Sequence, residues 1–264
     1  MQQDSNILQI DNLSKYFGGL AAVFNCSLNI KRGSITGIIG PNGSGKTTLF
    51  NLIAGNLKTS KGSVLFNNEN ITDVPSYELF SKGLLRTFQI AHEFTNLTVL
   101  ENLMMVPGNQ SGENLANALL KPKLIQKEEE EIKQKALKVI EFLSLKHLAN
   151  ELAGNLSGGQ KKLLELGRTM MVDAKLVLLD EVGAGVNRTL LKDLGTAIEK
   201  LNKEKGYTFC MIEHDMDFIG RLCDPVIVMA EGSVLFEGSV EEAKKDEKVI
   251  ESYLGRGSKL KDTN

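Results

Sequence analysis

The chain has no long hydrophobic run, few cysteines and almost no net charge, and each shortage excludes a class of protein. It has 264 residues, only three of them cysteines, and its formal net charge is −2. No apolar stretch approaches the roughly 18 residues that a membrane-spanning helix needs. The small net charge gives no general attraction to nucleic acid or to anionic lipid. The first residues are polar and lack a basic region, so we expect no signal peptide.

The cysteines also argue against a disulfide framework or a metal site. Cys26, Cys210 and Cys223 lie in apolar or strand-like segments and lack the spacing of a metal-binding motif. We therefore expect buried, reduced thiols, as in a cytosolic protein. The length suits one domain that contains an inserted subdomain.

A glycine-rich segment, Gly40 to Thr47, fits the phosphate-binding loop pattern G-x-x-x-x-G-K-[ST]. The apolar run Ile35–Ile39 before it predicts a buried strand, and residues 47–54 after it have helical spacing. Backbone N–H groups and a helix N-terminus bind a triphosphate, and glycine allows the backbone to come close. The predicted nucleotide-binding residues are Gly40, Pro41, Asn42, Gly43, Ser44, Gly45, Lys46, Thr47 and Thr48.

Two of these side chains have specific chemical tasks in such a loop. We expect Lys46 to reach the β- and γ-phosphates, which makes it a catalytic candidate as well. The Thr47 hydroxyl is expected to bind Mg²⁺. ATP and Mg²⁺ are thus the cofactors that the loop predicts.

A second strand-like run, Leu176–Asp180, ends in two successive carboxylates, Asp180 and Glu181. Parallel sheets bind ligands at the carboxyl ends of their strands, so we expect Asp180 to hold Mg²⁺, through water because this ion dehydrates reluctantly. Glu181 is expected to polarise the water that attacks the γ-phosphate. Taken alone, either carboxylate is equally well explained as a solvated strand end.

Gln89 and His214 each follow a further strand candidate, 84–88 and 209–213. Gln89 is a candidate for completing the Mg²⁺ shell and for contacting the attacking water. His214 is a candidate for a hydrogen bond to the γ-phosphate that also orients the water. Without the other motifs, Gln89 is explained as a polar strand cap and His214 as an ordinary surface or core residue.

The segment Ser157-Gly158-Gly159-Gln160, preceded by Leu156, begins a helical pattern that continues to Met170. Ser157 is a good N-cap residue, and the two glycines expose N–H donors. The segment therefore predicts a second anion site. The alternative is an ordinary capped helix.

With these motifs in this order, the chain resembles the nucleotide-binding subunits of ABC transporters nearly end to end. Gly40–Thr47 corresponds to the Walker A motif, Gln89 to the Q-loop, Leu156–Gln160 to the signature, Leu176–Asp180 to Walker B and His214 to the H-loop. The resemblance implies the α/β fold of P-loop NTPases. It adds a mainly parallel central sheet, an N-terminal antiparallel β-subdomain and a helical subdomain at about 90–171, within a single domain 1–264. It also implies that Phe17 stacks on adenine, with Tyr16 as the alternative.

The resemblance further implies how the protein works and with what. In the family, two subunits sandwich ATP, and the signature residues Ser157 to Gln160 meet the γ-phosphate bound by the opposite subunit. The expected partners are a second nucleotide-binding subunit, identical or paralogous, transmembrane permease subunits and an extracytoplasmic substrate-binding protein, with no nucleic acid. The expected location is the cytoplasmic face of the membrane. The surface over residues 90–97 receives the membrane partner in the family, although Phe94 and Leu97 are equally compatible with a local core.

The chain departs from the family pattern after Walker B. Val182-Gly183 stands where the family usually has Pro, and Asn187 in Ala184-Gly185-Val186-Asn187 stands where many members have Asp. The form of the segment Ala184–Asn187 and the ending Val249–Gly255 resemble the ATPases of branched-chain amino acid importers. A urea or amide importer, a lipopolysaccharide-type exporter and a soluble ABC protein remain alternatives.

The region between Gln89 and the signature is predicted to be helical. Its most charged part, 126–135, offers i,i+4 pairs Glu129–Lys133 and Glu131–Lys135 and is predicted to face solvent. The opposite side would be buried through Leu137, Ile140, Leu143 and Leu145. The chain is expected to end in a short helix over 247–255 and a disordered tail over 256–264.

Overall fold

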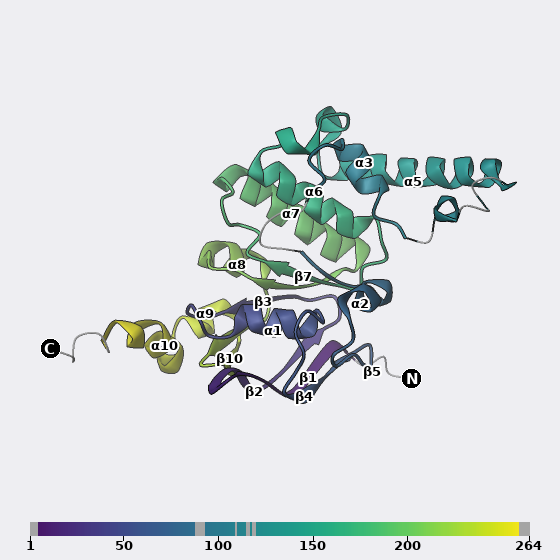
Figure 1. Ribbon diagram of the computed structural model, residues 1–264. Coiled ribbons are helices and arrows are strands. Elements are labelled where there is room, and N and C mark those ends of the chain that lie inside the picture. The colour runs from purple at the N-terminus through teal and green to yellow at the C-terminus, as the bar shows by residue number, and fades with distance from the viewer. Residues whose placement is uncertain (1–4, 88–92, 109, 115–116, 118–119, 259–264) are drawn as a thin grey trace. The chain divides into compact units, whose positions relative to one another are not determined.

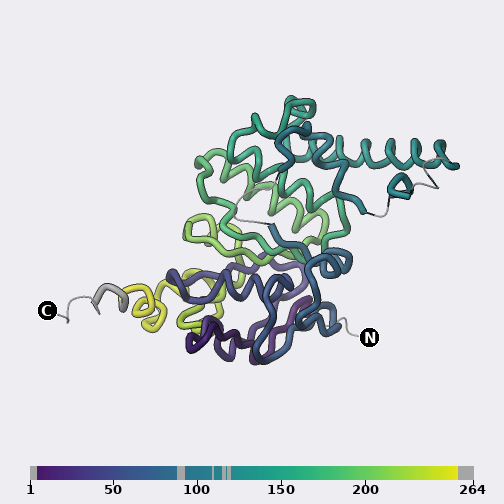
Figure 2. The backbone as a smooth tube through the Cα atoms, in the orientation of Figure 1, coloured from purple at the N-terminus to yellow at the C-terminus, as the bar shows by residue number. Residues whose placement is uncertain are grey.

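The fold consists of two compact units, each assembled from separate stretches of the chain. It comes from a computed structural model that describes residues 5–87, 93–108, 110–114, 117 and 120–258. Unit 1 comprises Met1–Arg86, Lys175–Gly183 and Glu199–Asn264, and unit 2 comprises Thr87–Ala174 and Ala184–Ile198. The tube in Figure 2 shows how unit 1 combines the beginning and the end of the chain.

The described residues of unit 1 form two sheets. A four-stranded antiparallel sheet has the order β2-β1-β4-β5, and a six-stranded sheet has the order β10-β9-β3-β8-β7-β6, in which only β10 runs antiparallel to its neighbour. The strands are β1 (Asn6–Phe17), β2 (Leu20–Lys31), β3 (Ile35–Ile39), β4 (Lys61–Phe66), β5 (Glu69–Asn70), β6 (Leu84–Arg86), β7 (Leu176–Asp180), β8 (Thr208–Ile212), β9 (Val226–Ala230) and β10 (Ser233–Gly238). Every residue of β3, β7 and β8 is buried, as parallel strands covered on both faces require.

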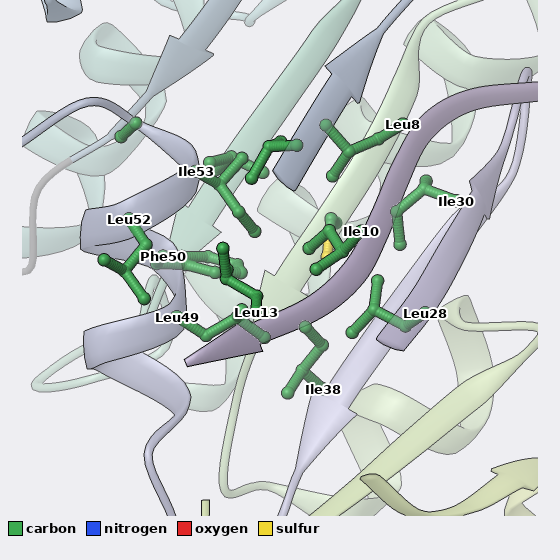
Figure 3. Close-up of a cluster of buried hydrophobic side chains, with 14 of the residues drawn as sticks. Leu8, Ile10, Leu13, Leu28, Ile30, Ile38, Leu49, Phe50, Leu52 and Ile53 are labelled. Carbon is green, nitrogen blue, oxygen red and sulfur yellow. The ribbon is translucent and has the colours of Figure 1, made fainter. Parts of the chain in front are cut away.

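The helices of unit 1 pack beside these sheets (Figure 1). They are α1 (Lys46–Ile53), α2 (Ser76–Lys82), α8 (Met216–Leu222), α9 (Val240–Ala243) and α10 (Glu247–Ser258). Figure 3 shows Leu49, Phe50 and Ile53 of α1 within the same apolar cluster as the inward side chains of β1 and β2. Burying each such side chain contributes about 1.5–3 kcal/mol, so the cluster fixes α1 and hence the loop before it.

Unit 2 is helical. Its elements are α3 (Val99–Met104), η1 (Ser111–Glu113), α5 (Pro122–Phe142), η2 (Lys146–Leu148), η3 (Ala153–Asn155) and α6 (Gly158–Met170), together with the first part of α7 (Arg188–Lys205), which continues into unit 1. No helix in the part of the chain that the structure describes is long and apolar enough to cross a membrane. Unit 2 thus includes the expected insertion at 90–171 and adds Ala184–Ile198.

The expected fold class is confirmed: an α/β fold with a mainly parallel sheet, an antiparallel N-terminal sheet and a helical insertion. The three cysteines are buried and free, and burial raises the pKa of Cys26 and Cys223 to about 12. The final helix extends to Ser258, beyond the predicted start of the tail, and residues 259–264 lie outside the described residues.

Helix α5 confirms the charged, solvent-facing helix but corrects its details. Ile140, Leu143 and Leu145 are buried as predicted, whereas Leu137 is 36% exposed, because the inward stripe runs through positions 136, 139, 140 and 143 instead. The predicted ion pairs also differ. Glu131 pairs with Lys127 at 3.7 Å, and Lys135 donates to the Met171 carbonyl at 3.0 Å.

Candidate functional site

The loop Gly40–Thr47 connects β3 to α1, as the sequence predicts, and its glycines are sterically required. Gly40 has φ 148° and Gly45 has φ 99°. A Cβ on Gly40 would lie 2.1 Å from the Met229 carbonyl oxygen, and one on Gly45 would lie 2.4 Å from that of Ala22. The loop is therefore packed tightly against β9 and β2, and any side chain at these two positions would displace it.

Lys46 lies inside this loop and is only 6% exposed. Its Nζ donates to the carbonyls of Gly40 at 2.8 Å and Pro41 at 3.0 Å, so the ammonium group is held at the loop's centre by weak neutral acceptors. No side chain in the described part of the chain caps α1, whose N-cap is Gly45. The first-turn N–H groups are thus left for an outside acceptor, and a phosphate satisfies them best.

The remaining loop positions divide by exposure. Ser44 is buried and Pro41, Gly45 and Thr48 are half-buried, whereas Asn42, Gly43 and Thr47 are exposed. The exposed Thr47 is the first-turn hydroxyl that the sequence assigned to Mg²⁺. The exposed loop positions are thus an asparagine, a glycine and a threonine, whose N–H and hydroxyl groups suit a ligand that binds through its phosphate oxygens.

Asp180, at the end of β7, is a buried carboxylate with a buried partner. Its Oδ2 accepts from Nη2 of Arg86 at 2.6 Å, and the two side chains are 4% and 9% exposed. Arg86 also donates through Nη1 to Oδ1 of Asn51 on α1, at 2.6 Å. The sequence did not identify Arg86 or Asn51, since no local spacing reveals a contact between residues 94 positions apart.

The structure brings Glu181 and His214 together, as their assignment to one reaction requires. Glu181 Oε1 and His214 Nε2 are 3.1 Å apart. An ionised carboxylate only accepts, so the imidazole donates through its Nε2–H. Glu181 has φ 48°, an uncommon conformation for a residue with a side chain, and its N–H donates to the Ile212 carbonyl at 2.9 Å.

Glu213 completes this arrangement and was missed at the sequence level. It is 5% exposed and accepts from the N–H groups of Gly183 at 2.7 Å and His214 at 3.3 Å. Burial is the main cause that raises the pKa of its carboxyl. Gly183 follows the position where the family usually has Pro, so Glu213 fixes the turn after Glu181 with a hydrogen bond. A glutamate between the apolar Ile212 and His214 is the signal that would have pointed to it.

Of the other three predicted residues, Gln89, Phe17 and Tyr16, the first lies outside the described residues. The structure does not bring Phe17 or Tyr16 into hydrogen-bond contact with the described residues of this site. Phe17 and Tyr16 end β1 and are 49% and 36% exposed, and Lys15 Nζ lies 5.3 Å from the centre of the Phe17 ring. The adjoining β2 presents the Ala22 carbonyl to the phosphate loop, so both rings belong to a hairpin that contacts the loop.

Within unit 2, Ser157 is the N-cap of α6, as predicted. Its Oγ accepts from the Gln160 N–H at 3.4 Å, and Gln160 Oε1 accepts from the Ser157 N–H at 2.9 Å. The two following glycines differ. A Cβ on Gly159 would lie 2.5 Å from Leu190 Cδ1, whereas one on Gly158 would have, among the described residues, only the Gly185 carbonyl near it, at 3.7 Å. Gly159 is therefore needed for packing, and Gly158 is not.

Similarity to known proteins agrees with this geometry. The sequence profile described as ABC transporter matches residues 23–184. A protein of Archaeoglobus fulgidus, named "Probable branched-chain amino acid transport ATP-binding protein LivG", is 45% identical over 94% of this chain and 95% of its own length. A protein of the same name from Methanocaldococcus jannaschii is 44% identical over 97% of this chain and its entire length.

Solved structures extend the similarity. The crystal structure of an ATP-binding cassette of an ABC transporter in its ADP conformation has a TM-score of 0.81 and 41% identity, covering 96% of this chain and all of that one. A dimeric cassette bound to ADP and Pi in a post-hydrolysis state has a TM-score of 0.72 and 26% identity, over 88% of this chain and 98% of that one. The match of the profile, the identity along almost the whole chain and the phosphate loop together show that this chain belongs to the ABC transporter family, as one of its ATPase cassettes.

Proposed function

We propose that the chain binds MgATP at the phosphate loop of unit 1 and hydrolyses it between two facing cassettes. The observation that carries this proposal is the 3.1 Å hydrogen bond between Glu181 and His214. This bond joins Glu181, proposed to activate the attacking water, to His214, proposed to orient that water. Both residues belong to unit 1, as the phosphate loop does. The dimeric, post-hydrolysis relative supports the pairing of two cassettes.

The donor set fits a magnesium nucleotide. Thr47 and Asp180 offer oxygen atoms, which a hard cation prefers, and Gln89 would add a third. When bound, Mg²⁺ would offset charge on the phosphate oxygens. Lys46 would exchange its carbonyl acceptors for the β- and γ-phosphates, which are stronger partners because they are charged.

Glu181 and His214 would act at the γ-phosphate. His214 would turn its Nε2–H from Glu181 to a γ-phosphate oxygen, and Glu181 Oε1 would accept a hydrogen bond from the attacking water. Phosphoryl transfer needs mainly such placement and charge compensation. Ser157, Gly158, Gly159 and Gln160 of the second cassette would supply donors from the other side. Phe17 would stack on adenine, with Tyr16 as the alternative.

The work of hydrolysis would pass to transmembrane permease subunits at the cytoplasmic face of the membrane. The names of the relatives support transport of branched-chain amino acids. The proposal is an importer of these or other small neutral amino acids, served by an extracytoplasmic substrate-binding protein. Co-purification with permeases, followed by uptake assays with leucine and urea in reconstituted vesicles, tests this assignment. Leucine uptake that needs ATP supports it, and urea uptake alone contradicts the cargo.

Glu181→Gln tests the catalytic assignment. The variant should bind ATP as well as the unmodified chain, lose hydrolysis by about 10²- to 10⁴-fold and accumulate as an ATP-bound dimer. Equilibrium nucleotide titration, phosphate release and sedimentation measure the three quantities. Glu204→Gln, at an exposed position of α7, is the matched control. Normal hydrolysis by Glu181→Gln would show that another group activates the water.

A further inference from the structure

Arg86 is a buried cation that contacts both the strand and the helix from which the proposed magnesium ligands come. It ends β6, which pairs with β7 in parallel, with Arg86 opposite Leu178. From there its two terminal nitrogens diverge, Nη2 to Asp180 on β7 and Nη1 to Asn51 on α1, each at 2.6 Å. The guanidinium carbon also lies 6.0 Å from the centre of the Phe50 ring.

The acceptor on α1, Asn51, is related to Thr47 by its position in the helix. Asn51 is four residues after Thr47, so the two lie on the same face, one turn apart. The guanidinium group of Arg86 therefore links Asn51, one helical turn after Thr47, to the Asp180 carboxylate. Its rigid plane fixes both acceptors at one separation, which a flexible ammonium group does not do.

Because Asp180 is buried, its ion pair with Arg86 determines the orientation of its carboxylate. A carboxylate that is 4% exposed has little water to orient it, so its direction is set by its hydrogen-bond partners. In the described part of the chain, Arg86 reaches Oδ2 of this carboxylate and no partner is seen at Oδ1. Oδ1 is therefore available to a water molecule of a hydrated ion.

We infer that Arg86 is a positioning residue for the magnesium site: it holds Asp180 and helix α1 in register, so that the Asp180 carboxylate and the Thr47 hydroxyl meet one ion. This inference rests on the proposed function, because it requires that Mg²⁺ accompany the nucleotide. It adds a residue outside the motifs that the sequence identified. It also explains why a charged side chain is buried beside a carboxylate that must stay available to a cation.

The test compares nucleotide affinity with and without magnesium in the full-length chain. Trinitrophenyl-ATP is titrated in EDTA and in MgCl₂, and MgCl₂ is titrated at fixed nucleotide. Arg86→Ala should weaken the apparent magnesium affinity by about ten- to a hundredfold, because one hydrogen bond between charged groups is lost. The nucleotide affinity measured in EDTA should not change. Arg86→Lys should recover part of the loss. Asn51→Ala should weaken magnesium binding by about two- to tenfold, since Arg86 keeps its bond to Asp180.

Arg86→Met serves as a second variant that fills similar volume against Phe50 if the alanine variant does not fold. Equal losses in EDTA and in magnesium would show a merely structural role, and unchanged or tighter magnesium binding would show that Arg86 does not position Asp180. Either result overturns the inference while the proposed function stands. If the unmodified chain itself gains no affinity from magnesium, the proposed function fails first.

Discussion

Helices α1 and α6 both begin at glycine-rich segments, but their first turns are satisfied in opposite ways. The start of α1 has Gly45 as its N-cap and no side-chain cap in the described part of the chain. The start of α6 has a reciprocal pair, Ser157 and Gln160, that satisfies two of its N–H groups. The free N–H groups of a first turn need acceptors from somewhere. We therefore expect the first helix to need an outside anion for its first turn, whereas the second satisfies two of its N–H groups itself and suits a site used only when a partner arrives.

Gly45→Ala should produce the largest effect, because it breaks the loop that depends on the ligand. The new Cβ would lie 2.4 Å from the Ala22 carbonyl oxygen at a φ of 99°, so the loop must shift and misalign its donors. We expect ATP affinity to fall by about a hundredfold or more, because several hydrogen bonds from the loop to the charged phosphates would be lost together. Fluorescence titration measures it. Gly33→Ala is the control, with φ 74° but open space around its Cβ, and should bind normally.

Gly158→Ala should produce the next largest effect, on turnover alone. Its Cβ finds only the Gly185 carbonyl, at 3.7 Å, so the single cassette should fold and bind ATP normally. The methyl group would obstruct the donors that we propose to face a partner's γ-phosphate, and we expect hydrolysis to fall by about ten- to a thousandfold, as for loss of one oxyanion donor. Phosphate release measures the hydrolysis of the single variant. Sedimentation of the double variant with Glu181→Gln measures ATP-dependent dimerisation. Unchanged hydrolysis would mean that α6 begins as an ordinary capped helix.

Gly159→Ala should instead lower stability. The added Cβ would lie 2.5 Å from Leu190 Cδ1, an overpacking that costs about 1–3 kcal/mol in the free energy of unfolding. Leu190→Ala in the same chain should recover part of that cost by making room. Denaturant unfolding of the two single variants and the double variant gives the coupling. Strictly additive changes would contradict the steric explanation.

The contrast between these neighbouring glycines could not be predicted from the sequence, where both belong to one motif. The sequence predicted what depends on local pattern: the buried strands β3, β7 and β8, the phosphate loop and the Ser157 cap. It failed where packing between distant segments decides. Leu137 has helical spacing that suits burial, but the phase of α5 is set by its neighbours. Similarly, nothing local indicates that Arg86 turns inward to a carboxylate 94 positions along the chain, and the glutamate at the end of β8 does not by itself reveal its hydrogen bond to Gly183.

Ser157→Ala should have a smaller effect on the free cassette, about 1 kcal/mol in the free energy of unfolding, since water replaces the lost cap. Ser157→Thr should restore most of it. Thr47→Ala, in the first turn of α1, should change stability by less than about 0.5 kcal/mol, because this exposed hydroxyl caps nothing. Thermal unfolding in EDTA, without nucleotide, measures all three. Equal losses at Ser157 and Thr47 would mean that both helices satisfy their own first turns, and the contrast between a ligand-dependent and a self-capped helix start would disappear.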